Sequence, residues 1–122
     1  MNSILISLIE HLKEGILIIR QDRTIYLSNS AFSEIFGFDK NLSSMTFDDL
    51  CVNDRFKKIC YLITKDLKEI KDNQVEIDSH LIVNVNFKKI EDNLFLLVID
   101  DITPEKITEK LKEDFVTVSA HQ

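Results

Sequence analysis

The hydrophobic pattern of this sequence changes at residues 72–73, and this change constrains the fold more than any other feature. Over residues 54–70, apolar side chains recur at every third or fourth position, which predicts an amphipathic helix. Beyond the break, apolar and polar residues alternate over 74–78 and 81–88, which predicts two strands with one buried and one solvated face. A chain with this pattern combines helices with an antiparallel sheet.

Three further strands are predicted on either side of this region. The run LFLLVID, residues 94–100, follows a polar turn at 91–93 and is almost entirely apolar, as expected for a strand in the centre of a sheet. Near the start of the chain, GILIIRQ and TIYLSN are separated by a short polar turn at residues 21–23 and predict a hairpin.

Short helices are predicted between this hairpin and the long helical stretch. Phe32 and Phe36 have helical spacing, and Gly37 ends that helix. Thr46 and Asp49 have the spacing of a capping box, which predicts another helical turn. The fold class is therefore α+β: a five-stranded antiparallel sheet with short helices on one face, flanked by an N-terminal and a C-terminal helix.

Length and composition describe one acidic domain. The 122 residues suffice for one hydrophobic core but are few for two, and they are 44% apolar and 30% charged. The net charge of -6 gives no basic surface of the kind that nucleic acid requires. Cys51 and Cys60 lie in apolar contexts without Cys-x-x-Cys spacing, so we expect reduced core residues rather than a disulfide or a metal pair.

Apolar stripes continue at both ends of the chain. In residues 1–14, five apolar residues recur at helical spacing: Ile4, Leu5, Leu8, Ile9 and Leu12. This run is too short to cross a bilayer and has no basic leader. Residues 103–105 predict a helix start, and Leu111, Phe115 and Val118 then have the spacing of a coiled-coil seam. The two stripes predict a parallel homodimer through the N-terminal and C-terminal helices.

The order of these elements resembles that of the PAS domain, a small sensory fold of signalling proteins. Gly15–Ile16 opens the first strand, as in that family. In TIYLSNSAFSEIFGF, Asn29 ends the second strand and Phe36–Gly37 closes the following helix, again as in the family. DDIT, residues 100–103, resembles the Asp-x-Thr signature between the last strand and an exit helix. The resemblance covers roughly residues 4–104.

The end of the chain resembles the start of the dimerisation and phosphotransfer domain of sensor histidine kinases. In EDFVTVSAHQ, Phe115 precedes His121 by six positions, as a Phe precedes the phosphorylated His of that family. The resemblance implies that His121 is the phosphoacceptor, whose imidazole nitrogen attacks the γ-phosphoryl group of ATP. Gln122 follows it and can accept a hydrogen bond only through its amide oxygen, so its help to the imidazole is weak.

The PAS resemblance also implies a role for the junction between the last strand and the exit helix. Thr103 is expected to cap that helix. Asp101 is expected to hold the junction through backbone N–H groups or through a nearby Lys such as Lys106. Ordinary capping explains the same residues equally well.

No cofactor or metal is predicted for this chain. Cys51, in LCVNDRF, does not match the reactive-Cys motif of blue-light flavin relatives, and residues 54–70 contain no His to serve as the proximal ligand of haem relatives. His11 and His80 are expected on the surface. The apolar space between helices and sheet either holds a small ligand or is filled, and we expect it to be filled by Phe32, Phe36, Phe56 and Phe87.

Together these features predict the sensory and dimerisation input module of a two-component histidine kinase. Residues 1–14 form the N-terminal helix, 15–103 the PAS core, and 104–122 the exit helix that reaches the phosphoacceptor motif. The chain has no Gly-rich nucleotide loop, so we do not expect it to phosphorylate itself. ATP, the kinase catalytic domain and the response regulator are partners of a parent kinase.

The alternative is a stand-alone PAS module that binds a small ligand or another protein and has no phosphotransfer role. A cytoplasmic location is expected in either case, and whether the parent protein is membrane-anchored stays open.

Overall fold

The computed structural model describes residues 3–38, 42–63, 67–104 and 106. Its centre is a five-stranded antiparallel sheet with the strand order β2-β1-β5-β4-β3. The strands are β1 (Gly15–Arg20), β2 (Ile25–Ser28), β3 (Ile70–Asp78), β4 (Leu81–Glu91) and β5 (Leu94–Asp101). The predicted α+β class and the predicted five-stranded sheet are confirmed.

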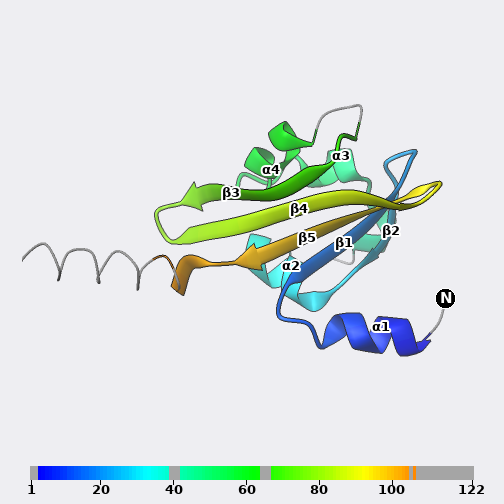
Figure 1. Cartoon of the computed structure of the whole chain (residues 1–122). Helices are drawn as coiled ribbons and strands as arrows, with labels where there is room; N and C mark the ends of the chain where they lie inside the picture. Colours follow the sequence, from blue (N-terminus) through cyan, green and yellow to red (C-terminus); the bar gives the residue numbers. More distant parts are fainter. Residues whose placement is uncertain (1–2, 39–41, 64–66, 105, 107–122) are drawn as a thin grey trace, which may run out of the picture.

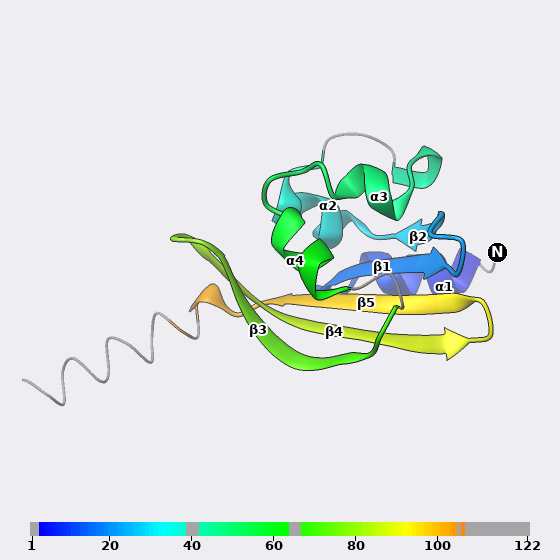
Figure 2. The same cartoon turned by 90° about the horizontal axis from the view of Figure 1, so that it is seen from above.

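Four short helical segments cover one face of this sheet, as Figures 1 and 2 show. They are α2 (Ser30–Phe36), the 3-10 helix η1 (Leu42–Ser44), α3 (Phe47–Leu50) and α4 (Lys57–Leu62). Helix α1 (Ser3–Glu10) instead packs through Ile9 on Ile16 and Ile18, which point to the opposite face. Among the described residues, the sheet therefore carries a helical layer on one side and helix α1 on the other.

Strand β5 is central, as its apolar composition predicted. It pairs with β1 on one side and with β4 on the other. Side chains alternate along it, so that Phe95, Leu97 and Ile99 enter the core under the helices. Its other apolar residues pack on the α1 side of the sheet: Leu94, Leu96 and Val98. Both faces of β5 are thus covered or half-buried, which explains why its sequence does not alternate in polarity.

Phenylalanine rings fill the centre of the core. Phe32, Phe36, Phe56 and Phe87 are at most 1% exposed, so their predicted positions are confirmed. Phe56 meets Phe32, Phe36 and Phe47 edge-on, with ring centroids 5.4, 5.0 and 5.6 Å apart. Edge-to-face contacts of this kind add to the free energy of burial, so Phe56 fixes the helical layer on the sheet.

The long helix predicted over residues 54–70 is wrong. Helix α4 has six residues, Ile63 is already extended, with φ -88° and ψ 98°, and Ile70 begins β3. There Ile70 pairs with Phe87 of β4. Strand pairing satisfies the backbone groups of this segment and places Ile70 against the core, which outweighs its helical spacing.

The predicted end of α2 and the predicted start of α3 are confirmed. Gly37 adopts a left-handed conformation with φ 75° and ends α2, which is the conformation that glycine favours. At the start of α3, Thr46 and Asp49 form the complete capping box: each side chain accepts a hydrogen bond from the backbone N–H of the other.

The buried amide of Asn29 joins four elements. Its Oδ1 accepts hydrogen bonds from the N–H groups of Ile16 and Phe32, at 2.9 and 3.0 Å. Its Nδ2 donates to the carbonyl oxygens of Ile9 and Glu14, both at 2.9 Å. Since the side chain is only 2% exposed, these contacts replace water and fix the relative positions of α1, β1, β2 and α2.

We expect Asn29→Ala to lower the free energy of unfolding by about 2–4 kcal/mol, because buried backbone donors and acceptors lose their partner. Asn73→Ala is the matched control, since Asn73 is exposed on β3, and it should change stability by less than about 0.5 kcal/mol. Urea unfolding followed by circular dichroism measures both. Equal unfolding midpoints for the two variants would contradict this account of Asn29.

Candidate functional site

The end of β5 is tied to the start of β4 by a side chain. The Thr103 hydroxyl accepts a hydrogen bond from the N–H of Ile82 at 2.8 Å and donates one to the Ile82 carbonyl oxygen at 3.2 Å. The same carbonyl accepts from the N–H of Ile102 at 2.9 Å. Because Val83 and Asp101 form the last pair of the β4–β5 ladder, the hydroxyl extends this ladder by one step. We call Ile82, Asp101, Ile102 and Thr103 the exit junction.

The Thr103 hydroxyl has a partner that the sequence did not predict. Its hydrogen bonds within the described residues go to β4, and its expected role in capping the exit helix stays a prediction. The first helical hydrogen bond runs from the N–H of Lys106 to the carbonyl oxygen of Ile102, at 3.0 Å. A hydroxyl bonded to Ile82 in this way holds the start of the exit segment to the sheet.

Asp101 accepts a hydrogen bond from the N–H of Thr103, at 3.0 Å. This is one of the two kinds of contact expected of it, and it fixes the backbone where β5 ends. Because a carboxylate that accepts from the residue two positions ahead forms an Asx-turn, it also turns the chain out of the sheet. The roles of Asp101 and Thr103 in signal coupling stay predictions.

The predicted phosphoacceptor lies outside the described residues. His121 and Gln122, together with the predicted seam of Leu111, Phe115 and Val118, belong to residues 107–122. Their assignments therefore also stay predictions. The two other histidines are on the surface, as expected: His80 is in the turn between β3 and β4, and His11 follows α1.

The two cysteines form a disulfide, so the prediction of two reduced core residues is wrong. Cys51 ends α3 and Cys60 lies in α4, and their Cα atoms are 5.9 Å apart. The chain reverses between them, because the Asn53 side chain accepts hydrogen bonds from the N–H groups of Arg55 and Phe56, at 2.9 Å each. This reversal brings α4 back alongside the end of α3. Asn53, a turn-forming residue between the two cysteines, is the sequence signal that predicts such an approach.

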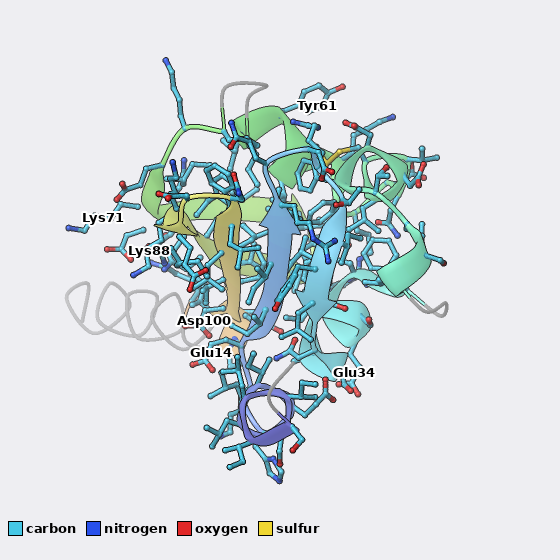
Figure 3. The ribbon with its side chains drawn as sticks, turned by 90° about the vertical axis from the view of Figure 1, so that its right-hand side faces the viewer. Glu14, Glu34, Tyr61, Lys71, Lys88 and Asp100 are labelled. Atoms are coloured by element: carbon cyan, nitrogen blue, oxygen red, sulfur yellow. A yellow bond between two sulfur atoms is a disulfide. The ribbon has the colours of Figure 1, made fainter. Side chains whose placement is uncertain are left out.

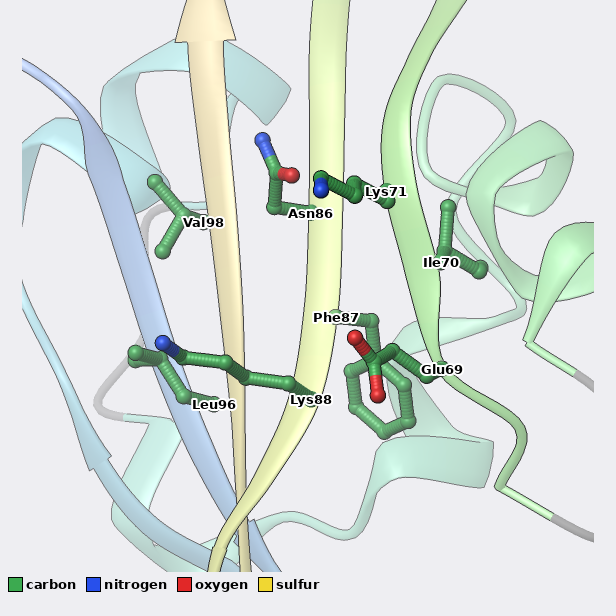
Figure 4. Close-up of a pocket in the computed structure, with 8 residues that line it drawn as sticks. All are labelled: Glu69, Ile70, Lys71, Asn86, Phe87, Lys88, Leu96 and Val98. Carbon is green, nitrogen blue, oxygen red and sulfur yellow. The ribbon is translucent and has the colours of Figure 1, made fainter.

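A groove of about 350 Å³ lies over β3, β4 and β5 (Figure 4). Asn86 and Lys88 of β4 and Leu96 and Val98 of β5 line it, and they alternate with core residues, so the groove faces away from the helical layer. Lys71 of β3 adds a second ammonium group. Sequence reasoning placed a ligand space only on the helical side and missed this hollow, which depends on how three strands pair.

One carboxyl group with a shifted pKa lies in the turn between β1 and β2. Hydrogen bonds from the hydroxyl and the N–H of Thr24 lower the pKa of the Asp22 carboxyl there.

Within residues 3–38, 42–63, 67–104 and 106, no cluster of three or more His, Cys, Asp or Glu side chains is placed to hold a metal ion. No helix in that part of the chain has the length and apolarity needed to span a membrane.

No protein-family model and no curated protein matches this sequence. Solved structures do resemble the fold. One is a domain of the sensory box sensor histidine kinase/response regulator from Geobacter sulfurreducens, with 15% identity and a TM-score of 0.53 over 81% of this chain and 92% of that one. A chain of the E. coli DhaR(N)–DhaL complex has 15% identity and a TM-score of 0.56, over 80% of this chain and 35% of that one.

A PAS domain from a two-component sensor histidine kinase is also similar, with 13% identity and a TM-score of 0.45, over 81% of this chain and 94% of that one. At identities this low, similarity establishes the fold and not the activity. The strand order, the helical layer on one face and the match to a sensory box domain agree with the resemblance found in the sequence. The chain therefore has the PAS fold.

Proposed function

We propose that this chain is the sensory input module of a two-component histidine kinase. In this proposal, a rearrangement of the PAS core passes through the exit junction to the segment that carries the phosphoacceptor His121. The observation that carries the proposal is the pair of hydrogen bonds between the Thr103 hydroxyl and Ile82, at 2.8 and 3.2 Å. The similar sensory box domain of the Geobacter histidine kinase supports the same class of protein.

The exit junction has the energetics that a switch requires. A hydrogen bond contributes about 0.5–1.5 kcal/mol net, so releasing Thr103 from Ile82 costs on the order of 1–3 kcal/mol. A ligand or a core rearrangement that favours one state by this amount shifts the population substantially. In this proposal the exit helix follows the position of β4, because Thr103, where the chain leaves the sheet, is bonded to Ile82 of that strand.

We further propose that the module acts as a homodimer through α1 and the exit helix. Leu5, Leu8 and Leu12 are 45, 62 and 45% exposed, although α1 is itself anchored to the core by Ile9 and the Asn29 amide. A helix fixed in place with its apolar side chains facing water is the kind of surface that a second copy covers.

A stand-alone module that binds a ligand or a protein is the second candidate. The groove favours it, because the charged groups of Glu69, Lys71 and Lys88 lie there beside an apolar floor, a combination that suits a small polar ligand. A chain of similar fold also occurs in the DhaR(N)–DhaL complex. In this case His121 has no phosphotransfer role, and the first experiment below separates the two candidates.

Incubating this chain with ATP and a purified histidine-kinase catalytic domain should place an acid-labile phosphoryl group on His121, and His121→Ala should reduce the label to background. His11→Ala and His80→Ala are the matched controls and should keep the label, because both residues lie on the surface of the sensory part. Phosphate incorporation and peptide mapping measure this outcome. Undiminished labelling of His121→Ala would refute the phosphoacceptor assignment.

Thr103→Val should open the exit junction, because valine keeps the shape of threonine but neither donates to nor accepts from Ile82. We expect the amide hydrogens of Ile82 and Ile102 to exchange about five- to thirtyfold faster, as the loss of about 1–2 kcal/mol implies. Thr103→Ser retains the hydroxyl and should stay close to wild type. Hydrogen exchange followed by NMR measures these rates, and equal rates for the Val and Ser variants would argue against the junction.

Leu8→Asp should weaken dimerisation at least about tenfold, since each interface would then bury a charge in place of an apolar side chain. Ser7→Asp introduces the same charge at the neighbouring position of α1 and should leave the dimer intact. Sedimentation velocity over a concentration series gives the dissociation constants. A monomeric wild-type chain, or equal effects of the two variants, would exclude α1 as the interface.

A further inference from the structure

The Cys51–Cys60 disulfide closes a short loop in the helical layer. The two residues are nine positions apart, and the loop between them contains the turn that joins α3 to α4. Figure 3 shows the S–S bond on the same side of the molecule as Tyr61. Both cysteines are half-buried, and their neighbours Val52 and Tyr61 are 78 and 77% exposed. A dissolved thiol can therefore approach this edge of the layer.

The loop carries the residue at the centre of the aromatic core. Phe56 lies within it, is 0% exposed and contacts the rings of Phe32, Phe36 and Phe47. Helices α3 and α4 have four and six residues, far fewer than an isolated helix needs for stability. Their positions therefore depend on the cross-link as well as on the burial of Phe56.

The same loop is bound to the strand that precedes the exit junction. The guanidinium of Arg55 lies 3.5 Å from the carboxylate of Asp78, and the Lys58 ammonium donates to the carbonyl oxygen of Glu76 at 2.9 Å. In the β3–β4 ladder, Glu76 is paired with Ile82. Since Ile82 in turn holds Thr103, a continuous set of contacts joins the disulfide loop to the exit segment.

We propose that Cys51–Cys60 is a redox-active site and that its reduction is an input signal of this module. This inference rests on the proposed function in one respect, namely that a change at the exit junction is passed on to His121. On reduction, α4 loses its covalent link to α3, the loop that contains Phe56 loosens, and the contacts of Arg55 and Lys58 with β3 weaken. The start of β4 and the exit junction then become less ordered.

The chemistry is an exchange with a dithiol reductant. One thiolate of the dithiol attacks one sulfur of the Cys51–Cys60 bond, and the other cysteine leaves as a thiolate and takes up a proton. The second thiolate of the reductant then attacks its own sulfur in the mixed disulfide and releases the remaining cysteine. Two electrons reduce the protein, and the dithiol is oxidised to a cyclic disulfide.

The test compares oxidised and dithiothreitol-reduced chain by thiol alkylation and by hydrogen exchange with mass spectrometry. Alkylation should add no group before reduction and two groups after it. Reduction should accelerate exchange about tenfold or more in residues 57–63 and at least about twofold in residues 74–82, with no change in β1. The double variant Cys51→Ser, Cys60→Ser is the control and should exchange like the reduced chain with or without dithiothreitol.

Four results would overturn the proposal. These are two alkylated thiols after incubation in oxidised glutathione, unchanged exchange on reduction, acceleration confined to residues 57–63, and acceleration that includes β1. If the double variant does not fold, the reduced wild-type chain supplies the same comparison. All readouts come from the chain itself, so a failure to phosphorylate His121 refutes the proposed function and leaves this result standing.

Discussion

The Asn29 amide is the interaction on which the arrangement of the PAS-fold core depends. Four backbone groups from three separate segments, those of Ile9, Glu14, Ile16 and Phe32, have this one side chain as a partner. The Ile9 carbonyl also accepts from the Leu12 N–H, but any of these groups left buried without a partner would cost about 1–3 kcal/mol, so the segments meet at this point. This close approach also explains why residue 15 is a glycine, because a Cβ there would lie 3.0 Å from the Cα of Phe32. Because α1 is held through Ile9, its residues Leu5 and Leu8 point into solvent.

A second side chain performs the corresponding task where the chain leaves the sheet. Thr103 satisfies the N–H and the carbonyl group of Ile82, as Asn29 satisfies groups of its neighbours. The two junctions lie at the same end of the sheet, because Gly15 at the start of β1 pairs with Ile99 near the end of β5. The segments before Gly15 and after Thr103 therefore attach to one end of the core (Figure 1).

Sequence patterns predicted the helices and strands that are determined by residues close together in the sequence. The alternation of buried Val83 and Val85 with their polar neighbours predicted β4, and the spacing of Thr46 and Asp49 predicted the start of α3. The extent of α4 could not be predicted in this way, because Ile70 has helical spacing but gains a partner in β4. The disulfide and the Thr103–Ile82 contact were also missed. Both join residues whose approach is set by a chain reversal or by strand register, and neither leaves a periodic signal in the sequence.

The relative strength of these contacts indicates where the core yields first. Removing a buried ring such as Phe56 costs about 3–5 kcal/mol, and losing the Asn29 amide costs about 2–4 kcal/mol. Release of Thr103 costs on the order of 1–3 kcal/mol, and the half-exposed contact between Arg55 and Asp78 contributes less. A perturbation that spreads from the α3–α4 loop through β3 therefore meets its weakest contacts at the loop itself and at the exit junction. The proposed function requires this order of strengths, because the exit segment must change its position while the aromatic core and the Asn29 junction stay folded.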